Sequence, residues 1–270
     1  MKNLQHHHDP SITQQDPWEK LKQFTDARIA LGRAGCSIPT RAMLDFQLSH
    51  AQAKDAVFQS LDVTQLQQQL TQLGLSHVHV HSQATDKESY LKRPDLGRIL
   101  ATEARQHLIQ QSNMQQKYDV CIVIGDGLSA AAVQENALPL IQALEHAFEE
   151  KQWSLAPIVI ATGARVAIGD EVAQIFKAPM LIMLIGERPG LSSPKSMGLY
   201  YTFKAQVGSL DAQRNCISNI RPAGLSIAMT TQRLLALIQR SNELGLSGVQ
   251  LKDEYITPAL EHRDNPKHLF

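Results

Sequence analysis

The chain has 270 residues and a formal net charge of zero, because 26 Lys and Arg balance 26 Asp and Glu. A balanced charge argues against a general nucleic-acid-binding protein, which is usually basic, and it leaves little repulsion to oppose association. Three cysteines that lie far apart exclude a disulfide scaffold and fit a reducing compartment. No apolar run reaches the ~18 residues of a membrane span, and the polar start lacks the apolar region of a secretory signal, so we expect a cytosolic protein.

The N-terminal part has an interrupted helical pattern. Three histidines at 6–8 are predicted to form a solvated tract rather than a metal site. Pro17 opens the first helical pattern, because proline suits the first helical position and Asp16 can cap the helix. A second helix is predicted from Pro39 to about Val57. The predicted organisation is a disordered tail over 1–16, a helical module over 17–62 and an α/β domain over 63–270.

A change of period marks the start of the second domain. Residues 77–81 alternate strictly between histidine and valine, which is typical of a half-buried strand. Their three histidines share one face and have the side chains to bind a metal, but no cysteine or acidic pair stands beside them. We therefore favour the polar face of an edge strand over a metal site.

Apolar, β-branched runs follow, separated by helical patterns. Residues 118–124, 157–161 and 179–185 are nearly continuously apolar, which is typical of parallel strands buried on both faces. Residues 200–203 predict a further strand, and 225–244 predict a last helix. Strands that alternate with helices predict an α/β fold, here a Rossmann-like parallel sheet domain preceded by a small N-terminal helical module.

The carboxyl ends of the predicted strands indicate where a ligand binds. In parallel sheets, ligands occupy the crevice beyond these ends. Glycine-containing loops follow three of the strands, over 125–129, 162–166 and 186–190. Glu187 lies in the last loop, where two interpretations stay open: a charged residue in a turn, or a carboxylate that faces a ligand.

The motifs of common enzyme classes are incomplete. Gly125 and Gly127 begin a dinucleotide-binding fingerprint, but Ala130 stands at the third glycine position and the acidic Glu145 falls inside the next helix. The chain has neither a P-loop nor a nucleophile elbow. Cys216 has no histidine near it in sequence, so we favour a small buried hydrophobic residue over a nucleophile.

Six short segments, taken in order, form a more specific pattern. They are Arg33-Ala34-Gly35, the stretch 90–98 (YLKRPDLGR), Asp126-Gly127-Leu128-Ser129, Arg165-Val166, the stretch 186–191 (GERPGL) and Cys216-Ile217-Ser218-Asn219-Ile220. The ordered set resembles the small subunits of ethanolamine ammonia-lyases, which are adenosylcobalamin-dependent enzymes. The resemblance extends over about residues 25–250.

The resemblance implies an enzyme that converts ethanolamine to acetaldehyde and ammonia by a radical mechanism. It implies a partner, the large subunit, which is a TIM-type barrel that holds the substrate, and an assembly that is a hexamer of large–small pairs. By motif, the contacts to adenosylcobalamin fall on Val166, Glu187 and Cys216. The small subunit is then inactive alone, with no catalytic residue and no metal ligand. Because the chain lacks a D-x-H-x-x-G motif, the nucleotide base of the cofactor is implied to stay on cobalt.

The family is often found in a bacterial microcompartment, to which a long amphipathic N-terminal extension directs it. Only about 16 polar residues precede the first predicted helix here, so we expect a protein that is at least partly free in the cytoplasm. Two other classes stay open from the residues alone. A stand-alone dehydrogenase requires a complete dinucleotide fingerprint, and a non-catalytic scaffold predicts that no corrin binds.

Overall fold

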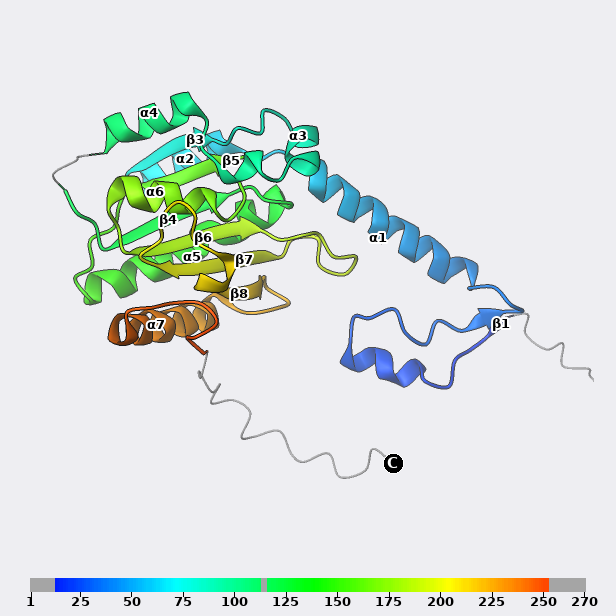
Figure 1. Cartoon of the computed structure of the whole chain (residues 1–270). Coiled ribbons are helices and arrows are strands. Elements are labelled where there is room, and N and C mark those ends of the chain that lie inside the picture. The colour runs from blue at the N-terminus through cyan, green and yellow to red at the C-terminus, as the bar shows by residue number, and fades with distance from the viewer. Residues whose placement is uncertain (1–12, 113–115, 253–270) are drawn as a thin grey trace, which may run out of the picture.

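The computed structural model describes residues 13–112 and 116–252 (Figure 1). Its strands are β1 (Thr13–Gln14), β2 (Arg33–Ala34), β3 (His77–His81), β4 (Val120–Gly125), β5 (Ile158–Thr162), β6 (Met180–Gly186), β7 (Met197–Phe203) and β8 (Arg214–Ile220). Its α-helices are α1 (Thr40–Phe58), α2 (Val63–Gln72), α3 (Lys87–Lys92), α4 (Thr102–Gln111), α5 (Ala130–Glu150), α6 (Ile168–Phe176) and α7 (Ile227–Leu244). Short 3-10 helices are η1 (Glu19–Phe24), η2 (Leu96–Arg98) and η3 (Asp211–Gln213).

A six-stranded sheet in the order β3-β5-β4-β6-β7-β8 forms the centre of the fold. The first four strands in this order run parallel, whereas β7 and β8 form antiparallel pairs. The α/β class and the helical N-terminal part predicted from the sequence are confirmed, but the sheet is only mostly parallel. The connection over 187–196 from β6 to β7 is shorter than the dozen or more residues of a parallel crossover, so the chain forms a hairpin.

The two ends of the sheet differ in how clearly the sequence predicts them. The alternating segment is β3, an edge strand in which Val78 and Val80 are buried and His79 is exposed, as predicted. The strand β8 was not predicted, because polar residues separate its buried positions Ile217 and Ile220. A strand with this composition becomes recognisable only when its partner β7 is known.

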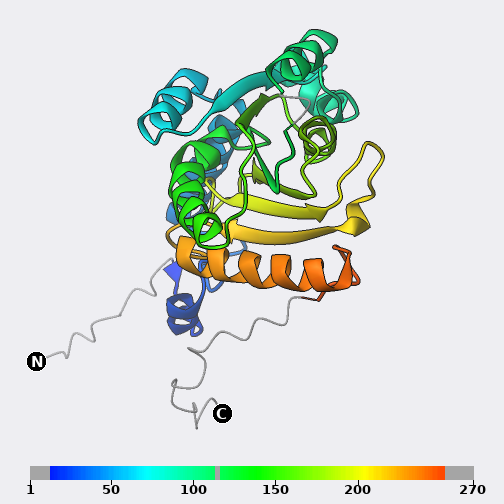
Figure 2. The ribbon, with the colours of Figure 1, turned by 90° about the vertical axis from the view of Figure 1, so that its left-hand side faces the viewer.

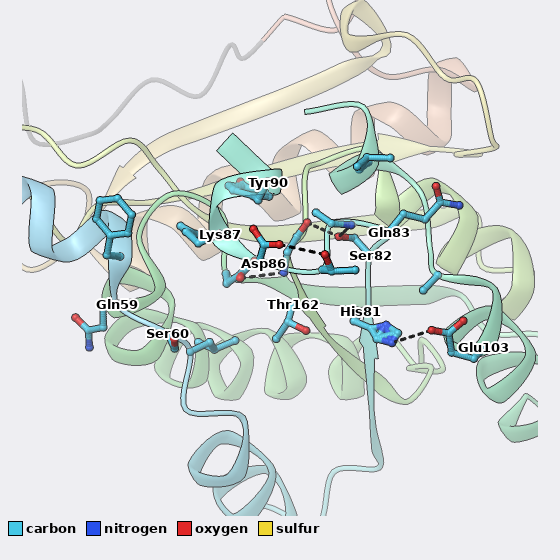
Figure 3. A pocket seen from close by; sticks show the side chains of 18 of the residues that line it. Gln59, Ser60, His81, Ser82, Gln83, Asp86, Lys87, Tyr90, Glu103 and Thr162 are labelled. Atoms are coloured by element: carbon cyan, nitrogen blue, oxygen red, sulfur yellow. Dashed lines mark hydrogen bonds and ion pairs between the residues drawn. The ribbon is translucent and has the colours of Figure 1, made fainter. Parts of the chain in front are cut away.

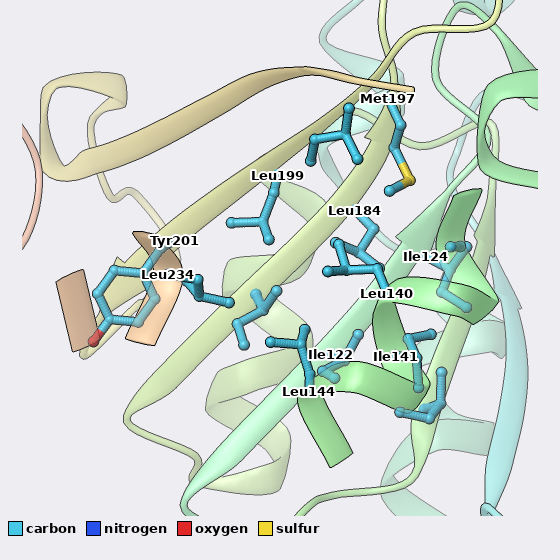
Figure 4. Packing of buried hydrophobic residues seen from close by; sticks show 14 of the residues in the cluster. Ile122, Ile124, Leu140, Ile141, Leu144, Leu184, Met197, Leu199, Tyr201 and Leu234 are labelled. Atoms are coloured by element: carbon cyan, nitrogen blue, oxygen red, sulfur yellow. The ribbon is translucent and has the colours of Figure 1, made fainter. Parts of the chain in front are cut away.

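Helices cover both faces of the sheet (Figure 2). Side chains of α2, α5 and α7 form one core with the strands, and side chains of α4 and α6 form the other. Alternate residues of β4 enter different cores: Ile122 and Ile124 lie on the α5 side (Figure 4), whereas Cys121 and Val123 lie on the α6 side. This strand is buried on both faces, as its nearly continuous apolar sequence predicted.

The N-terminal segment is arranged differently from the rest of the chain. α1 extends away from the α/β domain, and the segment with β1, η1 and β2 lies near its far end (Figure 1). Only Ala53 and Ala56 of α1 are buried, and η1 has no buried residue. Most of the predicted tail lies outside the described residues, but Thr13 and Gln14 pair with β2. Among the described helices, none is long and apolar enough to cross a membrane.

Candidate functional site

The carboxyl ends of β3, β4, β5 and β6 meet at one edge of the sheet, here called the carboxyl edge. The helix after β4, α5, packs on one face, and the helix after β5, α6, packs on the other. The connections therefore diverge between β4 and β5, which is where α/β sheets form their ligand crevice. A cleft of about 660 Å³ opens beside this position, over the ends of β3 and β5, and the α1–α2 connection and α3 complete its lining (Figure 3).

Asp126, directly after β4, ties two loops of the carboxyl edge together. Its carboxylate accepts N–H hydrogen bonds from Gly127, Gly163 and Ala164, each at 2.9 Å. Burial raises the pKa of Asp126, and these three bonds together with the charge of Lys87 counteract the rise. The side chain is thus a half-buried acceptor that holds the loop after β4 against the loop after β5.

Two cationic side chains lie against the ring of Tyr90, a residue of α3 beside the cleft. The Cζ atom of Arg165 is 4.1 Å from the centroid of the Tyr90 ring, and the Nζ atom of Lys87 is 4.9 Å from it. The Tyr90 hydroxyl donates a hydrogen bond of 3.2 Å to the carbonyl of Ala164. Burial lowers the pKa of Lys87, and the charge of Arg165 adds to this effect while Asp126 opposes it. These contacts fix α3 on the loops that follow β4 and β5.

Gly127 allows the loop after β4 to approach the end of β6. Its φ of +58° is in the left-handed region, and a Cβ atom here would collide with the carbonyl oxygen of Gly186. The N–H of Leu128 donates to the same oxygen at 3.0 Å. The close approach of the two loops therefore explains the glycine at position 127 without a bound dinucleotide. Glu145 lies inside α5, as predicted, so no acidic residue takes the position that a dinucleotide site requires.

Glu187 and Cys216 both lie on the α6 side of the sheet, close enough that the charge of Glu187 affects the pKa of Cys216. The Oε2 atom of Glu187 accepts hydrogen bonds from the Ser196 hydroxyl at 2.5 Å and from the Asn219 N–H at 3.3 Å. Cys216 is exposed, so the interpretation of a small buried residue was wrong; its neighbour on β7 is Tyr200. Partial burial raises the pKa of the Cys216 thiol, and the Glu187 charge adds to the rise. The hydrogen bond with Tyr200 opposes the rise, so the environment of Cys216 does not favour the thiolate overall.

Val166 lies in the connection between β5 and α6. It is half-buried and packs against the same core as Tyr200, so it shares the α6 side of the sheet with Glu187 and Cys216. The Val166 carbonyl accepts the N–H of Gly169 at 3.2 Å, in the first turn of α6. The three residues singled out from the sequence thus lie on one side of the sheet, although Cys216 belongs to a strand that was not predicted.

Several residues at this edge had no role assigned from the sequence. Asp126, Tyr90 and Arg165 stand inside the quoted segments, yet only the structure shows that they meet. Lys87 had no sequence signal. Within residues 13–112 and 116–252, no three His, Cys, Asp or Glu side chains gather as metal ligands, and the Nε2 atom of His81 lies 3.4 Å from a carboxylate oxygen of Glu103.

Comparison with known proteins agrees with the sequence motifs. The family model described as "Ethanolamine ammonia-lyase light chain (EutC)" matches residues 15–252. The chain belongs to this family. Curated ethanolamine ammonia-lyase small subunits are similar to it over nearly their whole length. That of Pseudomonas fluorescens (strain Pf0-1) is 49% identical over 253 residues, which are 93% of this chain and 92% of the relative.

Two further ethanolamine ammonia-lyase small subunits show the same degree of similarity. That of Pseudomonas aeruginosa (strain UCBPP-PA14) is 48% identical over 94% of this chain and 93% of its own length. That of Azotobacter vinelandii (strain DJ / ATCC BAA-1303) is 49% identical over 91% of this chain and 92% of its own length. The resemblance seen in six short segments therefore extends over almost the entire chain.

Proposed function

We propose that this chain is the cofactor-binding small subunit of an ethanolamine ammonia-lyase, a carbon–nitrogen lyase. The complex converts ethanolamine to acetaldehyde and ammonia with adenosylcobalamin. The large subunit, a TIM-type barrel, holds the substrate, and the assembly is a hexamer of large–small pairs in the cytoplasm or a microcompartment. The observation that carries the proposal is the family match over residues 15–252.

The loop after β6 and the neighbouring exposed side of β8 have features that suit a flat macrocycle rimmed by amide groups. Cys216 and Ser218 alternate along β8 and are both exposed, which leaves small side chains on this side of the strand. Gly198 of β7 has no side chain, and a Cβ atom there would lie 3.0 Å from the Oε1 atom of Glu187. The Glu187 carboxylate therefore lies over the β6–β7 hairpin, where its Oε1 atom can accept an amide N–H. We infer that these residues fit adenosylcobalamin.

In this proposal the residues of the chain bind and orient rather than react. Glu187 accepts a hydrogen bond from an amide of the cofactor, Val166 supplies an apolar contact, and Cys216 permits close approach because its side chain is small. Asp126 keeps the loops after β4 and β5 in place. Adenosylcobalamin held by these residues would supply the carbon radical that the reaction needs.

The test is to co-express this chain with the large subunit and assay acetaldehyde after addition of adenosylcobalamin and ethanolamine. Activity is expected only from the complex. Activity of this chain alone would contradict the subunit role, and a complex that binds no corrin would favour a scaffold.

The role of Glu187 has its own test. We expect Glu187→Ala to weaken adenosylcobalamin binding by the complex roughly tenfold or more, since one hydrogen bond that involves a charged group contributes about 1.5–3 kcal/mol. Spectroscopic titration of the corrin measures the change. Glu149→Ala is the matched control, because Glu149 is an exposed carboxylate near the end of α5, at the opposite edge. Unchanged affinity of the Glu187 variant would remove this residue from the cofactor site.

A further inference from the structure

The N-terminal segment exposes more large apolar side chains than the rest of the described chain. Between residues 18 and 58, nine such side chains are more than a third exposed, against seven elsewhere. They are Trp18, Leu21, Phe24, Ile38, Met43, Leu44, Phe46, Leu48 and Phe58. At roughly half exposure and about 150–250 Å² each, the four aromatic side chains alone present on the order of 400 Å², to which the five aliphatic ones add. Monomeric proteins rarely expose more than a few hundred Å² in one patch, and a stable interface needs about 800 Å² from each partner.

Four exposed apolar residues of α1 form a stripe on the side of the helix opposite its two buried alanines. Leu44, Leu48, Ala51 and Phe58 follow the spacing of one helical face, and all four are exposed. At about 100° per residue, this stripe lies roughly 150° around the helix from Ala53 and Ala56, the two buried residues. The helix therefore packs on its own chain with small residues and presents Leu44, Leu48 and Phe58 on the other side, which is the opposite of an ordinary surface helix.

The position of α1 connects this stripe to the carboxyl edge. Phe58, the last residue of α1, lines the cleft together with Gln59 and Ser60, so the helix meets the domain at this edge (Figure 3). From there it extends away from the sheet (Figure 1).

The segment before α1 returns to the same edge. Arg28 donates a hydrogen bond of 3.3 Å to the carbonyl of Leu191, and the Ser192 hydroxyl donates one of 3.3 Å to the carbonyl of Asp26. Leu191 and Ser192 belong to the β6–β7 connection, which also contains Glu187. The N-terminal segment thus contacts this edge at two places, around residues 26–28 and at Phe58.

We propose that α1 and η1 dock onto the large subunit, with the outward stripe of α1 at the centre of the contact. This inference rests on the proposed function, in which the large subunit faces the carboxyl edge; a partner in that position lies alongside α1 as well. The charges of α1 favour a protein partner over an anionic membrane, because Arg41 and Lys54 are balanced by Asp45 and Asp55. This N-terminal arm, made of η1 and α1, is then an interface separate from the cofactor contacts. It contributes to the affinity for the large subunit even when no cofactor is bound.

The experiment measures the affinity of the purified full-length chain for the large subunit by biolayer interferometry, without cofactor. The double variant Leu44→Asp/Leu48→Asp places two charges in the stripe at positions that are 57% and 60% exposed. We expect affinity to fall on the order of a hundredfold, because two leucines lose their burial in the contact. The control Leu210→Asp/Val249→Asp changes residues that are 67% and 74% exposed near the opposite edge, and it should change affinity less than about threefold.

Thermal melting verifies that each variant is folded, and Trp18→Ala/Phe24→Ala provides an independent perturbation of the same interface through η1. Wild-type affinity in both arm variants overturns the inference and leaves the proposed function intact. No binding of the wild-type chain to the large subunit overturns the proposed function itself. A wild-type homodimer that the Leu44/Leu48 variant converts to monomer, with unchanged affinity for the large subunit, assigns the stripe to a second copy and also overturns the inference.

Discussion

The hydrogen bonds of Asp126 predict what happens when its charge is removed. In Asp126→Asn, one acceptor oxygen becomes an NH₂ group. The Oδ1 atom accepts from Gly127 and Ala164, and Oδ2 accepts from Gly163, so either orientation of the amide leaves at least one backbone N–H without its acceptor. An unsatisfied buried N–H costs about 1–3 kcal/mol, and the remaining bonds weaken because the acceptor is no longer charged. The substitution also removes the desolvation penalty of the Asp126 carboxylate, which offsets part of this loss of stability.

We therefore expect Asp126→Asn to lower the free energy of unfolding by about 2 kcal/mol, which corresponds to a fall in Tm of about 4–8 °C for a chain of this size. Differential scanning fluorimetry measures the stability, and corrin titration of the complex measures cofactor affinity. Affinity should fall as well, since the loops after β4 and β5 lose a common acceptor.

Asp119→Asn provides the control at the other end of β4. Asp119 also uses its carboxylate to join two segments, accepting the Ser154 N–H at 2.7 Å and the Ser154 hydroxyl at 2.6 Å. This variant should lose about 1 kcal/mol of stability and keep its cofactor affinity. The reasoning is refuted by an Asp126→Asn protein with wild-type Tm, or by equal loss of cofactor affinity in both variants.

Two further predictions concern the core. Leu140→Ala should lower the free energy of unfolding, measured by chemical denaturation, by about 3 kcal/mol, because Leu140 is fully buried between α5 and the sheet (Figure 4). The control Leu244→Ala, at an exposed position, should change the free energy of unfolding by less than about 1 kcal/mol. Similar effects of both substitutions would contradict the described core. Burial raises the pKa of Tyr201 to about 12 from 10.0, so the folded state keeps this phenol neutral, and its contribution to stability is complete below pH 10 and falls as the pH rises from 10 to 12. Denaturation at pH 9 and pH 11.5 should therefore show a smaller alkaline loss, by about 1–2 kcal/mol, in Tyr201→Phe than in the wild type, and equal losses would show that Tyr201 does not titrate in this way.

The fold class was predictable because its signals are local. The strands β4, β5 and β6 are buried on both faces, which requires nearly continuous apolar sequence. The strand β3 lies at an edge with one exposed histidine between two buried valines, and this alternation is visible in five residues. Of the hairpin of β7 and β8, the sequence predicted only β7. The strand β8 was missed because its residues are buried only through contact with β7, which the sequence does not show.

The candidate site was predictable to a smaller extent. Its place at the carboxyl edge follows from the order of strands and helices, and Glu187 stands directly after a predicted strand. Cys216 was misjudged, because the sequence does not show which side of β8 is left exposed. The importance of Asp126 could not be read from its neighbours, since two of its three hydrogen bonds reach residues 37 and 38 positions away.

The sequence by itself determined the α/β class and, through its six ordered segments, the family. These properties depend on residue types and on short spacings along the chain. Only the tertiary structure decided that β7 and β8 run antiparallel, that Lys87, Tyr90 and Arg165 stack beside Asp126, and that α1 turns its large apolar residues outward. The physical reason is that such features depend on which distant segments share a surface. The zero net charge indicated only that little electrostatic repulsion opposes association. The structure adds an N-terminal segment with nine exposed large apolar side chains, which are a surface on which association can occur.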